Sequence, residues 1–328
     1  MALRTRIQIA LVALALLVLA AILGLWHYRE PIARDMLNGY FAQRGIPISY
    51  KIKAIETRRQ RLEQVRIGDP AQPDLVADWV EIDVGPSLTG LSVKAFRAGG
   101  LRLWGKQTGE KISFGSLDRL LPAPSGSAFR LPRVDLALED ARLALESPYG
   151  RAGLRLDGQG NLRSGFEGKL ALVSPRLGQA GCAAEQVQLY GDVSVIGARP
   201  TYTGPVRFAA LRCGSLTSGP GDVRLDASLS EDARNWRGSG RWTLGAVTAL
   251  GLRLPAITGG GEFSGDAQQT KARFEVQAYD LSAPSLTANG LTIAAKASIG
   301  PQTLLVDGQA KLRGARANGQ AHEAQQAL

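Results

Sequence analysis

The sequence predicts a mainly β protein, in which a single N-terminal transmembrane helix precedes a long, curved antiparallel β-sheet. Three observations predict this fold class. An uncharged apolar run fills residues 7–26, alternating apolar and polar residues recur from Ile48 onward, and no strong helical pattern separates the alternating stretches. Glycine contributes 39 of the 328 residues, about 12% against a usual share of roughly 7%, as expected for short strands joined by tight turns.

The composition excludes several functional classes. With 45% hydrophobic and 21% charged residues, the chain is too apolar and too weakly charged to be disordered. Its histidines are His27 and His322, and it has two cysteines. The chain therefore has almost no histidine that could serve in a His-dependent catalytic triad, and the usual spacings of a structural zinc site are absent. We expect no catalytic residues, no metal and no cofactor.

The first predicted element is a membrane anchor from Ile7 to Trp26, in which Gln8 is the one clearly polar side chain. A helix needs about 20 apolar residues to cross a bilayer. A cleaved signal peptide would have a shorter run and small residues after it, whereas Leu25–Tyr28 is bulky, so we expect an uncleaved anchor. Residues 1–28 then form a cytoplasmic head and anchor, and residues 29–328 an exported β-rich region.

A short helix is predicted after the anchor, within Pro31–Arg44. Its apolar residues have helical spacing, and Pro31 suits a first helical turn. We expect this helix to pack on the first strands of the sheet through its apolar face. That face consists of Ile32, Met36, Leu37, Tyr40 and Phe41.

The alternating stretches place apolar side chains on one face and polar side chains on the other, as in a sheet with one buried face. We expect turns at Asp157–Gly158, Ala288–Gly290 and Asp307–Gly308, because Gly, Asn and Asp favour turns, and a loop at Pro122–Ser127. The predicted strands include Ser49–Ile55, Ala77–Val84, Arg133–Glu139, then after a break at Asp140 Ala141–Glu146, Gly153–Asp157, Lys169–Leu172, Gln186–Tyr190, Asp192–Val195, Val206–Phe208, Asp222–Asp226, Arg273–Gln277 and Leu291–Ile293.

The length of the strand region predicts an extended sheet. About 270 residues at roughly 13 residues per strand and turn give about 20 strands, which at about 4.8 Å each form a sheet on the order of 100 Å long. The apolar face of such a sheet must be covered by something. The sheet could close into a barrel or sandwich, or curl into an open gutter. Both structures fit the alternation, so the pattern does not distinguish between them.

Two cysteines, Cys182 and Cys213, lie beside the glycines Gly181 and Gly214. In an exported chain with no other cysteine we expect them to form a disulfide. Such a bridge contributes about 3–4 kcal/mol in the chain-entropy model. The alternative is a pair of buried thiols that behave as small apolar residues.

Several segments resemble the N-terminal half of the YdbH proteins, which belong to the AsmA-like group of Gram-negative envelope proteins and are related in architecture to TamB. The resemblance covers most of the chain, and its motifs are structural rather than catalytic. The spacing of the two cysteines also fits. The segments are the anchor, Pro73–Asp78, Phe114–Pro122, Ala141–Gly150, Gly165–Leu170 and Gly204–Arg207.

The resemblance implies an inner-membrane protein with a single anchor and a periplasmic β-gutter, which carries phospholipid between the inner and outer membranes. Its expected partners are phospholipid, the inner membrane, and periplasmic or outer-membrane proteins. Members of the family are longer, and residues 320–328 look like the opening of a helix. We therefore expect the exported region to be incomplete at its C-terminus.

If the gutter is open, its apolar face binds acyl chains by partition, at about 0.8 kcal/mol per CH₂ removed from water. The alternative for each residue of that face is ordinary core packing. The candidate lipid-groove residues are Leu136, Leu138, Leu143, Leu145, Leu154, Leu156, Leu170, Leu172, Val187, Leu189, Val193, Val195, Val206 and Phe208.

Two other functions compete. A packed β-scaffold would act as a non-catalytic structural or assembly factor of the outer membrane, recruiting partners through strand addition. A carbohydrate enzyme would need two carboxylates within reach, but scattered acids such as Asp135, Glu139, Asp226 and Glu275 are expected on solvated strand faces.

The net charge of +10 has its densest cluster close to the anchor, where it either attracts anionic headgroups or forms a solvated strand face. No nucleic-acid motif accompanies the charge, and we expect no nucleic-acid partner. The cluster consists of Arg58, Arg59, Arg61 and Arg66.

Overall fold

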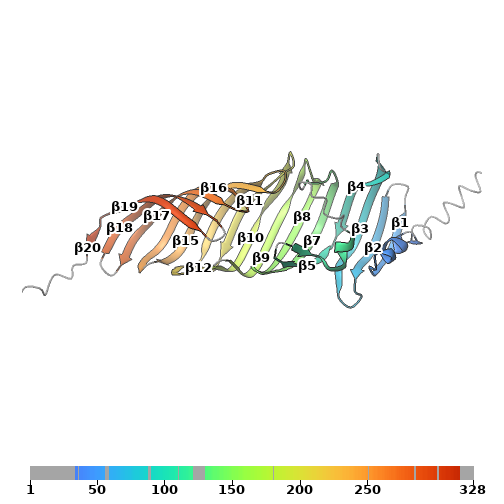
Figure 1. The fold of residues 1–328 in the computed structure, drawn as a ribbon, viewed down its shortest axis with the longest axis horizontal. Coiled ribbons are helices and arrows are strands. Elements are labelled where there is room, and N and C mark those ends of the chain that lie inside the picture. The colour runs from blue at the N-terminus through green and yellow to red at the C-terminus, as the bar shows by residue number, and fades with distance from the viewer. Residues whose placement is uncertain are drawn as a thin grey trace, which may run out of the picture.

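The computed structural model describes residues 34–35, 37–55, 59–87, 90–109, 111–120, 130–179, 181–249, 251–283, 286–300 and 303–317. They form one 20-stranded sheet, whose strands follow one another along a single long axis from β1 to β19 and β20 (Figure 1). The predicted mainly β fold with one large sheet is confirmed. In these ranges no helix is long and apolar enough to cross a membrane, and the predicted anchor Ile7–Trp26 lies outside them.

The N-terminal part begins with a short helix, in which residues 34–35 and 37–43 are helical. This confirms the described part of the helix predicted within Pro31–Arg44. The elements that follow are β1 (Ile48–Ile55), β2 (Arg59–Gly68), β3 (Pro73–Ser87), β4 (Gly90–Gly99), β5 (Arg102–Thr108), β6 (Lys111–Ser113) and the 3-10 helix η1 (Gly115–Leu120).

The second part contains only strands and their connections in the described ranges. They are β7 (Asp135–Ser147), β8 (Gly150–Asn161), β9 (Phe166–Gln179), β10 (Cys182–Ile196), β11 (Arg199–Phe208), β12 (Ala210–Cys213), β13 (Leu216–Ser218), β14 (Gly221–Leu229), β15 (Asn235–Ala249), β16 (Leu252–Asp266), β17 (Thr270–Ala283), β18 (Leu286–Ile299), β19 (Leu304–Arg313) and β20 (Arg316–Ala317).

Some short strands lie end to end and together occupy a single strand position in the sheet. β4 and β5 both pair with β3 in one register, from Trp79–Gly99 to Leu75–Leu103. Likewise β10 pairs with β11 and then with β12, and β15 pairs with β14 and then with β13. The sheet is therefore about fifteen strands wide, or about 70 Å at 4.8 Å per strand. The expected 100 Å was too long, although the number of strands was close.

One joint in the sheet is parallel. β7 pairs in parallel with β4 and with β5, whereas all the other described pairings are antiparallel. A parallel neighbour needs a crossover connection. Here the crossover contains β6 and η1, and the predicted loop Pro122–Ser127 lies in its undescribed portion. The expectation of a wholly antiparallel sheet was wrong at this joint.

Four non-glycine residues inside strands have positive φ: Gln64, Asp140, Gln186 and Asp280. The pairing of β7 with β8 shifts register between Leu138 and Ala141, on either side of Asp140. Such a β-bulge bends its strand and increases the local twist. The bulge at Asp140 also keeps Leu138 and Ala141 on one face, although they are three residues apart.

Three predicted turns were wrong. Asp157–Gly158 lies within β8, Ala288–Gly290 within β18 and Asp307–Gly308 within β19. At Gly158 and Gly308, close packing of the neighbouring strand requires glycine, whereas Gly290 has ordinary contacts only. A Cβ atom on Gly158 would lie 2.6 Å from the ring of Phe166, on the neighbouring strand β9. Gly158 is therefore required because the ring lies where its side chain would be.

Two clusters of buried apolar residues occur in the described sheet. The larger lies at its N-terminal end, around Ile46, Val65, Ala77 and Ala98, and the smaller lies on β17 and β18. In the described chain no large side chain is fully buried. Among the described elements, η1 packs on β2 and β3, and no second layer of described residues packs against the middle strands.

Candidate functional site

One face of the sheet carries an unbroken apolar row, with one residue from each strand it crosses. Directly paired residues lie on the same face of a sheet, so the register of each strand pair determines which residues belong to the row. No member of this row is charged, and its glycine, Gly259, lies beneath the ring of Trp242. Row A consists of Ile48, Ile67, Leu75, Leu103, Leu143, Leu154, Leu172, Leu189, Val206, Val223, Trp242, Gly259, Val276, Ile293 and Ala310.

A second row runs beside the first. From β8 onward it is four residues away along each strand, and therefore on the same face. Its one polar group is the hydroxyl of Tyr202, which donates to the Pro205 carbonyl at 3.0 Å. Row B consists of Ile52, Leu62, Val80, Ala98, Leu138, Gly158, Gly168, Val193, Tyr202, Ala227, Gly238, Phe263, Ala272, Ala297 and Val306.

We call the face with rows A and B the apolar face, and its part from β7 to β19 the apolar strip. All fourteen candidate groove residues lie on this face. Five are members of row A (Leu143, Leu154, Leu172, Leu189, Val206) and two of row B (Leu138, Val193). The others occupy the same face on the same strands: Leu136, Leu145, Leu156, Leu170, Val187, Val195 and Phe208.

The candidate residues are shielded without being enclosed. Val187 and Val195 are buried, at 8% and 6% exposure, and the other twelve are half-buried. On the opposite face of β9, Val173 is 58% exposed. Side chains that shield one another on an unlayered sheet surface fit an open apolar face better than a closed core.

Aromatic rings on the strip lie over glycines of the neighbouring strand. A Cβ atom would lie 2.6 Å from the Phe263 ring at Gly238, 2.2 Å from the Phe208 ring at Gly221 and 2.7 Å from the Trp242 ring at Gly259. Rings that cover glycines in this way stabilise a sheet. The largest side chains therefore lie along the sheet surface, so the strip has no tall obstacle at these positions.

The face opposite rows A and B, which we call the polar face, carries charged and polar side chains. A hollow of about 1190 Å³ lies on this face over β11–β19, and it is no site for an acyl chain because charged side chains line it. A row on this face includes the ion pair of Lys169 with Asp192. Its members are Asp157, Lys169, Asp192, Thr203, Asp226, Ser239, Glu262, Arg273, Lys296 and Asp307.

The first helix and η1 together form an N-terminal cap over the apolar face. Leu37 and Phe41 of the helix, and Leu117 and Leu120 of η1, pack on the N-terminal buried cluster. The hydroxyl of Tyr50 on β1 donates to Asn38 at 3.0 Å, which ties the helix to the sheet. Partial burial raises the pKa of this phenol.

Two sequence motifs meet in this cap. Asp74, from Pro73–Asp78, accepts hydrogen bonds from the Ser116 amide at 2.9 Å and from the Ser116 hydroxyl at 2.5 Å. Within Phe114–Pro122, Asp118 accepts from the Ser113 hydroxyl at 2.6 Å and from the Phe114 amide at 2.8 Å, and these bonds lower its pKa. The motifs that carried the family resemblance thus build the cap.

Two members of the basic cluster near the anchor, Arg59 and Arg61, form ion pairs. Arg59 and Arg97 each lie within 3.2 Å of both Glu81 and Asp83, and Arg61 lies 3.6 Å from Glu81. Desolvation raises the pKa of Asp83, but the hydrogen bonds from Arg97 and Arg59 outweigh it, so the pKa is lowered. Arg58 lies outside the described residues. These contacts favour the predicted polar strand face over a headgroup site for Arg59 and Arg61.

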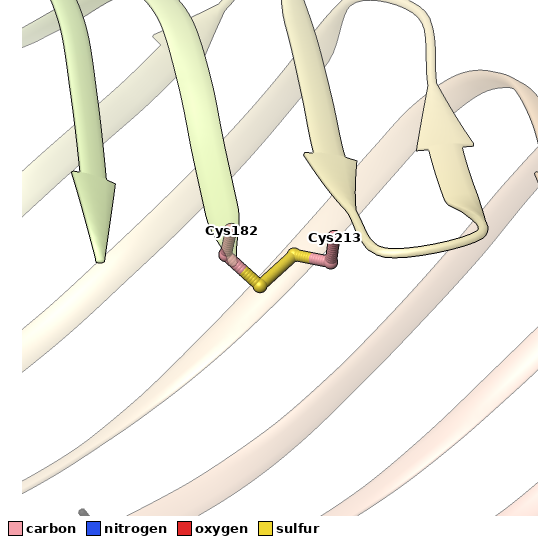
Figure 2. The surroundings of a disulfide bond; sticks show 2 residues. All are labelled: Cys182 and Cys213. Carbon is pink, nitrogen blue, oxygen red and sulfur yellow. A yellow bond between two sulfur atoms is a disulfide. The ribbon is translucent and has the colours of Figure 1, made fainter. Parts of the chain in front are cut away.

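The predicted disulfide is present between Cys182 and Cys213 (Figure 2). The two cysteines are directly paired at the ends of β10 and β12. Strand β12 continues β11 after a break at Ala209, whose amide donates to the Glu185 carbonyl at 2.8 Å. The disulfide therefore fixes this strand extension to β10.

The acidic residues considered for an enzyme are not gathered into one site. Asp135 accepts a hydrogen bond from Asn161 at 2.9 Å, and Asp226 and Glu275 lie on β14 and β17, with β15 and β16 between them. In the described ranges no group of three or more His, Cys, Asp or Glu residues has a geometry suited to a metal. The continuous apolar strip is thus the most distinctive feature of this surface.

A family model described as "Intermembrane phospholipid transport protein YdbH" matches residues 16–328. The chain belongs to the YdbH-like family. The resemblance predicted from the sequence motifs is therefore confirmed, and lipid transport is the general function of the family. No curated protein and no solved structure matches the chain.

The C-terminal half of the strip of this YdbH-like chain was not among the predicted groove residues. Val223, Val276 and Ile293 continue row A through alternating stretches that had been recognised only as strands. Around Gly259 the alternation is obscured, because small residues occupy both faces of β16. Cross-strand register, which the sequence does not show, was needed to join these segments.

Proposed function

We propose that this chain is a membrane-anchored periplasmic protein that moves phospholipid between the inner and outer membranes along the apolar strip. The observation that carries the proposal is the absence of charge from rows A and B, which continue from strand to strand across the described sheet. The family description supports the substrate class. The fourteen candidate residues are the proposed lipid-contacting positions.

Partition explains how such a face would work. Each acyl CH₂ removed from water contributes about 0.8 kcal/mol, so a chain of ordinary length is strongly held. Movement along the strip needs contacts that are equivalent from one strand to the next. Leucine and valine at successive positions of row A supply them. The aromatic rings lie flat on neighbouring glycines and do not project from the surface.

The proposed arrangement places Ile7–Trp26 in the inner membrane, with residues 1–6 in the cytoplasm and the region from residue 29 in the periplasm. The long exported region is expected to cross regardless of its charge. The headgroup remains outside the strip, since a phosphate would lose hydration on an uncharged apolar surface.

Photolabelling with a phospholipid that carries a diazirine in its acyl chain tests the proposal. The full-length protein is reconstituted in vesicles that contain this lipid, illuminated, and digested for mass spectrometry. Leu172 and Val173 are adjacent in β9 but lie on opposite faces, so each serves as the control for the other. We expect label on Leu172 and other strip residues and little on Val173. Equal labelling of both, or no label on the strip, would refute the proposal and favour a packed scaffold.

A further inference from the structure

The apolar face is not uniformly uncovered along its length. Over β1–β3, side chains of the N-terminal cap lie on it: Leu37 and Phe41 from the helix, and Leu117 and Leu120 from η1. Ile67 of row A is only 8% exposed beneath this cap, and Ala77 beside it is fully buried. The first members of row A therefore already have protein partners.

Polar contacts hold the cap in place. Ser116 of η1 donates twice to Asp74 of β3, and Arg119 donates to the carbonyls of Arg44 and Gly45, at 3.2 and 2.8 Å. The second contact fastens η1 to the end of the first helix. The helix, η1 and β3 are thus joined as one unit by Asp74 and Arg119.

The boundary of this cover falls at the parallel joint. Leu138 of β7 still packs on the capped cluster, and the Phe114 ring lies 3.0 Å from the position of a Cβ atom on Gly105 of β5. From β8 onward the candidate residues of the strip belong to neither buried cluster. In row A, Ile48, Ile67 and Leu75 belong to the capped cluster, whereas Leu103, Leu143 and Leu154 do not.

We infer that the N-terminal cap is a plug that closes the membrane-proximal end of the apolar face, so that acyl chains join the strip from the side, at β7 and β8. This inference rests on the proposed function. Leu37 and Phe41 occupy the surface that an acyl chain would otherwise cover. The covered stretch from β1 to β7 spans on the order of 20 Å at 4.8 Å per strand.

The plug has a physical consequence for the path of the lipid. A chain leaving the bilayer beside residue 34 cannot follow row A from its first member, because Ile67 and Ala77 have little surface left to contact. It must pass beside the cap and meet the sheet where the apolar face is first uncovered. Loosening the polar contacts should expose β2 and β3 without altering the strip.

The distribution of diazirine-phospholipid label along the sheet tests the plug in the full-length protein. In the wild type we expect label on Leu154, Leu172 and Leu189, and at least tenfold less on Ile67 and Leu75. Comparable label on Leu75 and Leu154 would overturn the plug but leave the proposed function standing. Absence of label from the whole apolar face would instead overturn the proposed function.

A pair of variants strengthens the test. Asp74→Ala removes both hydrogen bonds from Ser116, and we expect label on Ile67 and Leu75 to rise several-fold, with label on Leu172 unchanged. Asp78→Ala removes an exposed carboxylate from the same strand and should leave the wild-type distribution. Retained label on Leu172 shows that the sheet is folded in each variant. With that condition met, an unchanged label on Leu75 in Asp74→Ala would contradict the plug.

Discussion

Replacing Leu172 by aspartate separates an open lipid-binding face from a packed core. Leu172 lies at the centre of row A, between Leu154 and Leu189. Full burial of a leucine contributes about 1.5–3 kcal/mol, so loss of a half-buried one costs about 1–1.5 kcal/mol. Water reaches an open face, which limits the further cost of the carboxylate. We expect Leu172→Asp to lower the free energy of unfolding by about 1–2 kcal/mol.

A closed core would respond differently, because an unpaired charge buried without water costs about 3–5 kcal/mol. For a chain of this size, each kcal/mol shifts Tm by about 2–4 °C. The open face therefore predicts a fall of about 2–8 °C in the full-length protein. A core would also lose the full burial of the leucine, about 1.5–3 kcal/mol, so the total of about 4.5–8 kcal/mol predicts a fall of about 9–32 °C. Val173→Asp, at a position 58% exposed on the polar face, is the matched control and should change Tm by less than 3 °C.

Lipid labelling completes this test. An aspartate in row A interrupts the apolar contacts, so diazirine-phospholipid label should fall on one side of Leu172 more than on the other. Label retained at Leu154 but lost at Val223 would mean that lipid is loaded from the N-terminal end. A Tm loss above 10 °C would refute the open face, and unchanged stability with unchanged label would show that the wrong face had been assigned.

Three further predictions concern the disulfide, the acidic hydrogen bonds and the anchor. Cys182 and Cys213 are 31 positions apart, so replacing both by serine should cost about 3–4 kcal/mol, and denatured, unreduced wild-type protein should show no free thiol; two labelled thiols would contradict the bridge. The pKa of Asp118 and that of Asp83 are lowered from 3.8, so their stabilisation is complete above the unfolded pKa and is lost as pH falls through the folded pKa. Unfolding measured by denaturant should therefore vary little from pH 8 to about 5 through these groups and weaken below about 4, less so in Asp118→Asn; equal acid sensitivity of that variant would refute the assignment. Alkaline phosphatase fused after Arg44 should be active in cells, and a folded but inactive fusion would reverse the proposed topology.

Period-two alternation predicted which strands exist and which side chains share a face. It worked best where leucines alternate with charges, as around Leu143 and Leu154, because the two faces then differ most in polarity. The break recognised at Asp140 is a real β-bulge with φ of 52°. Alternation could not show that this bulge returns Leu138 and Ala141 to one face, because that depends on the pairing with β8.

Glycine was the main source of error. Gly158 and Gly308 were interpreted as turn residues, yet both lie inside strands, where a neighbouring strand leaves no space for a Cβ atom. The parallel joint was also beyond prediction, since it depends on a crossover that passes over the sheet and not on any local pattern. The cap contact between Asp74 and Ser116 joins residues 42 positions apart, which explains why the two motifs looked unrelated in the sequence.

Because rows A and B repeat from strand to strand, the length of the apolar face depends on the number of β-hairpins in the sheet. Each added pair of antiparallel strands lengthens the sheet by about 9.6 Å and supplies two more members to each row, without a new type of contact. Because β16, β17 and β18 pair in simple succession, a hairpin inserted between β16 and β17 would leave the cap, the disulfide and the remaining pairs intact. One inserted between β10 and β11 would instead separate Cys182 from Cys213. A protein built in this way can be fitted to a wider or narrower gap between membranes by the number of its hairpins, while its chemistry toward an acyl chain stays the same.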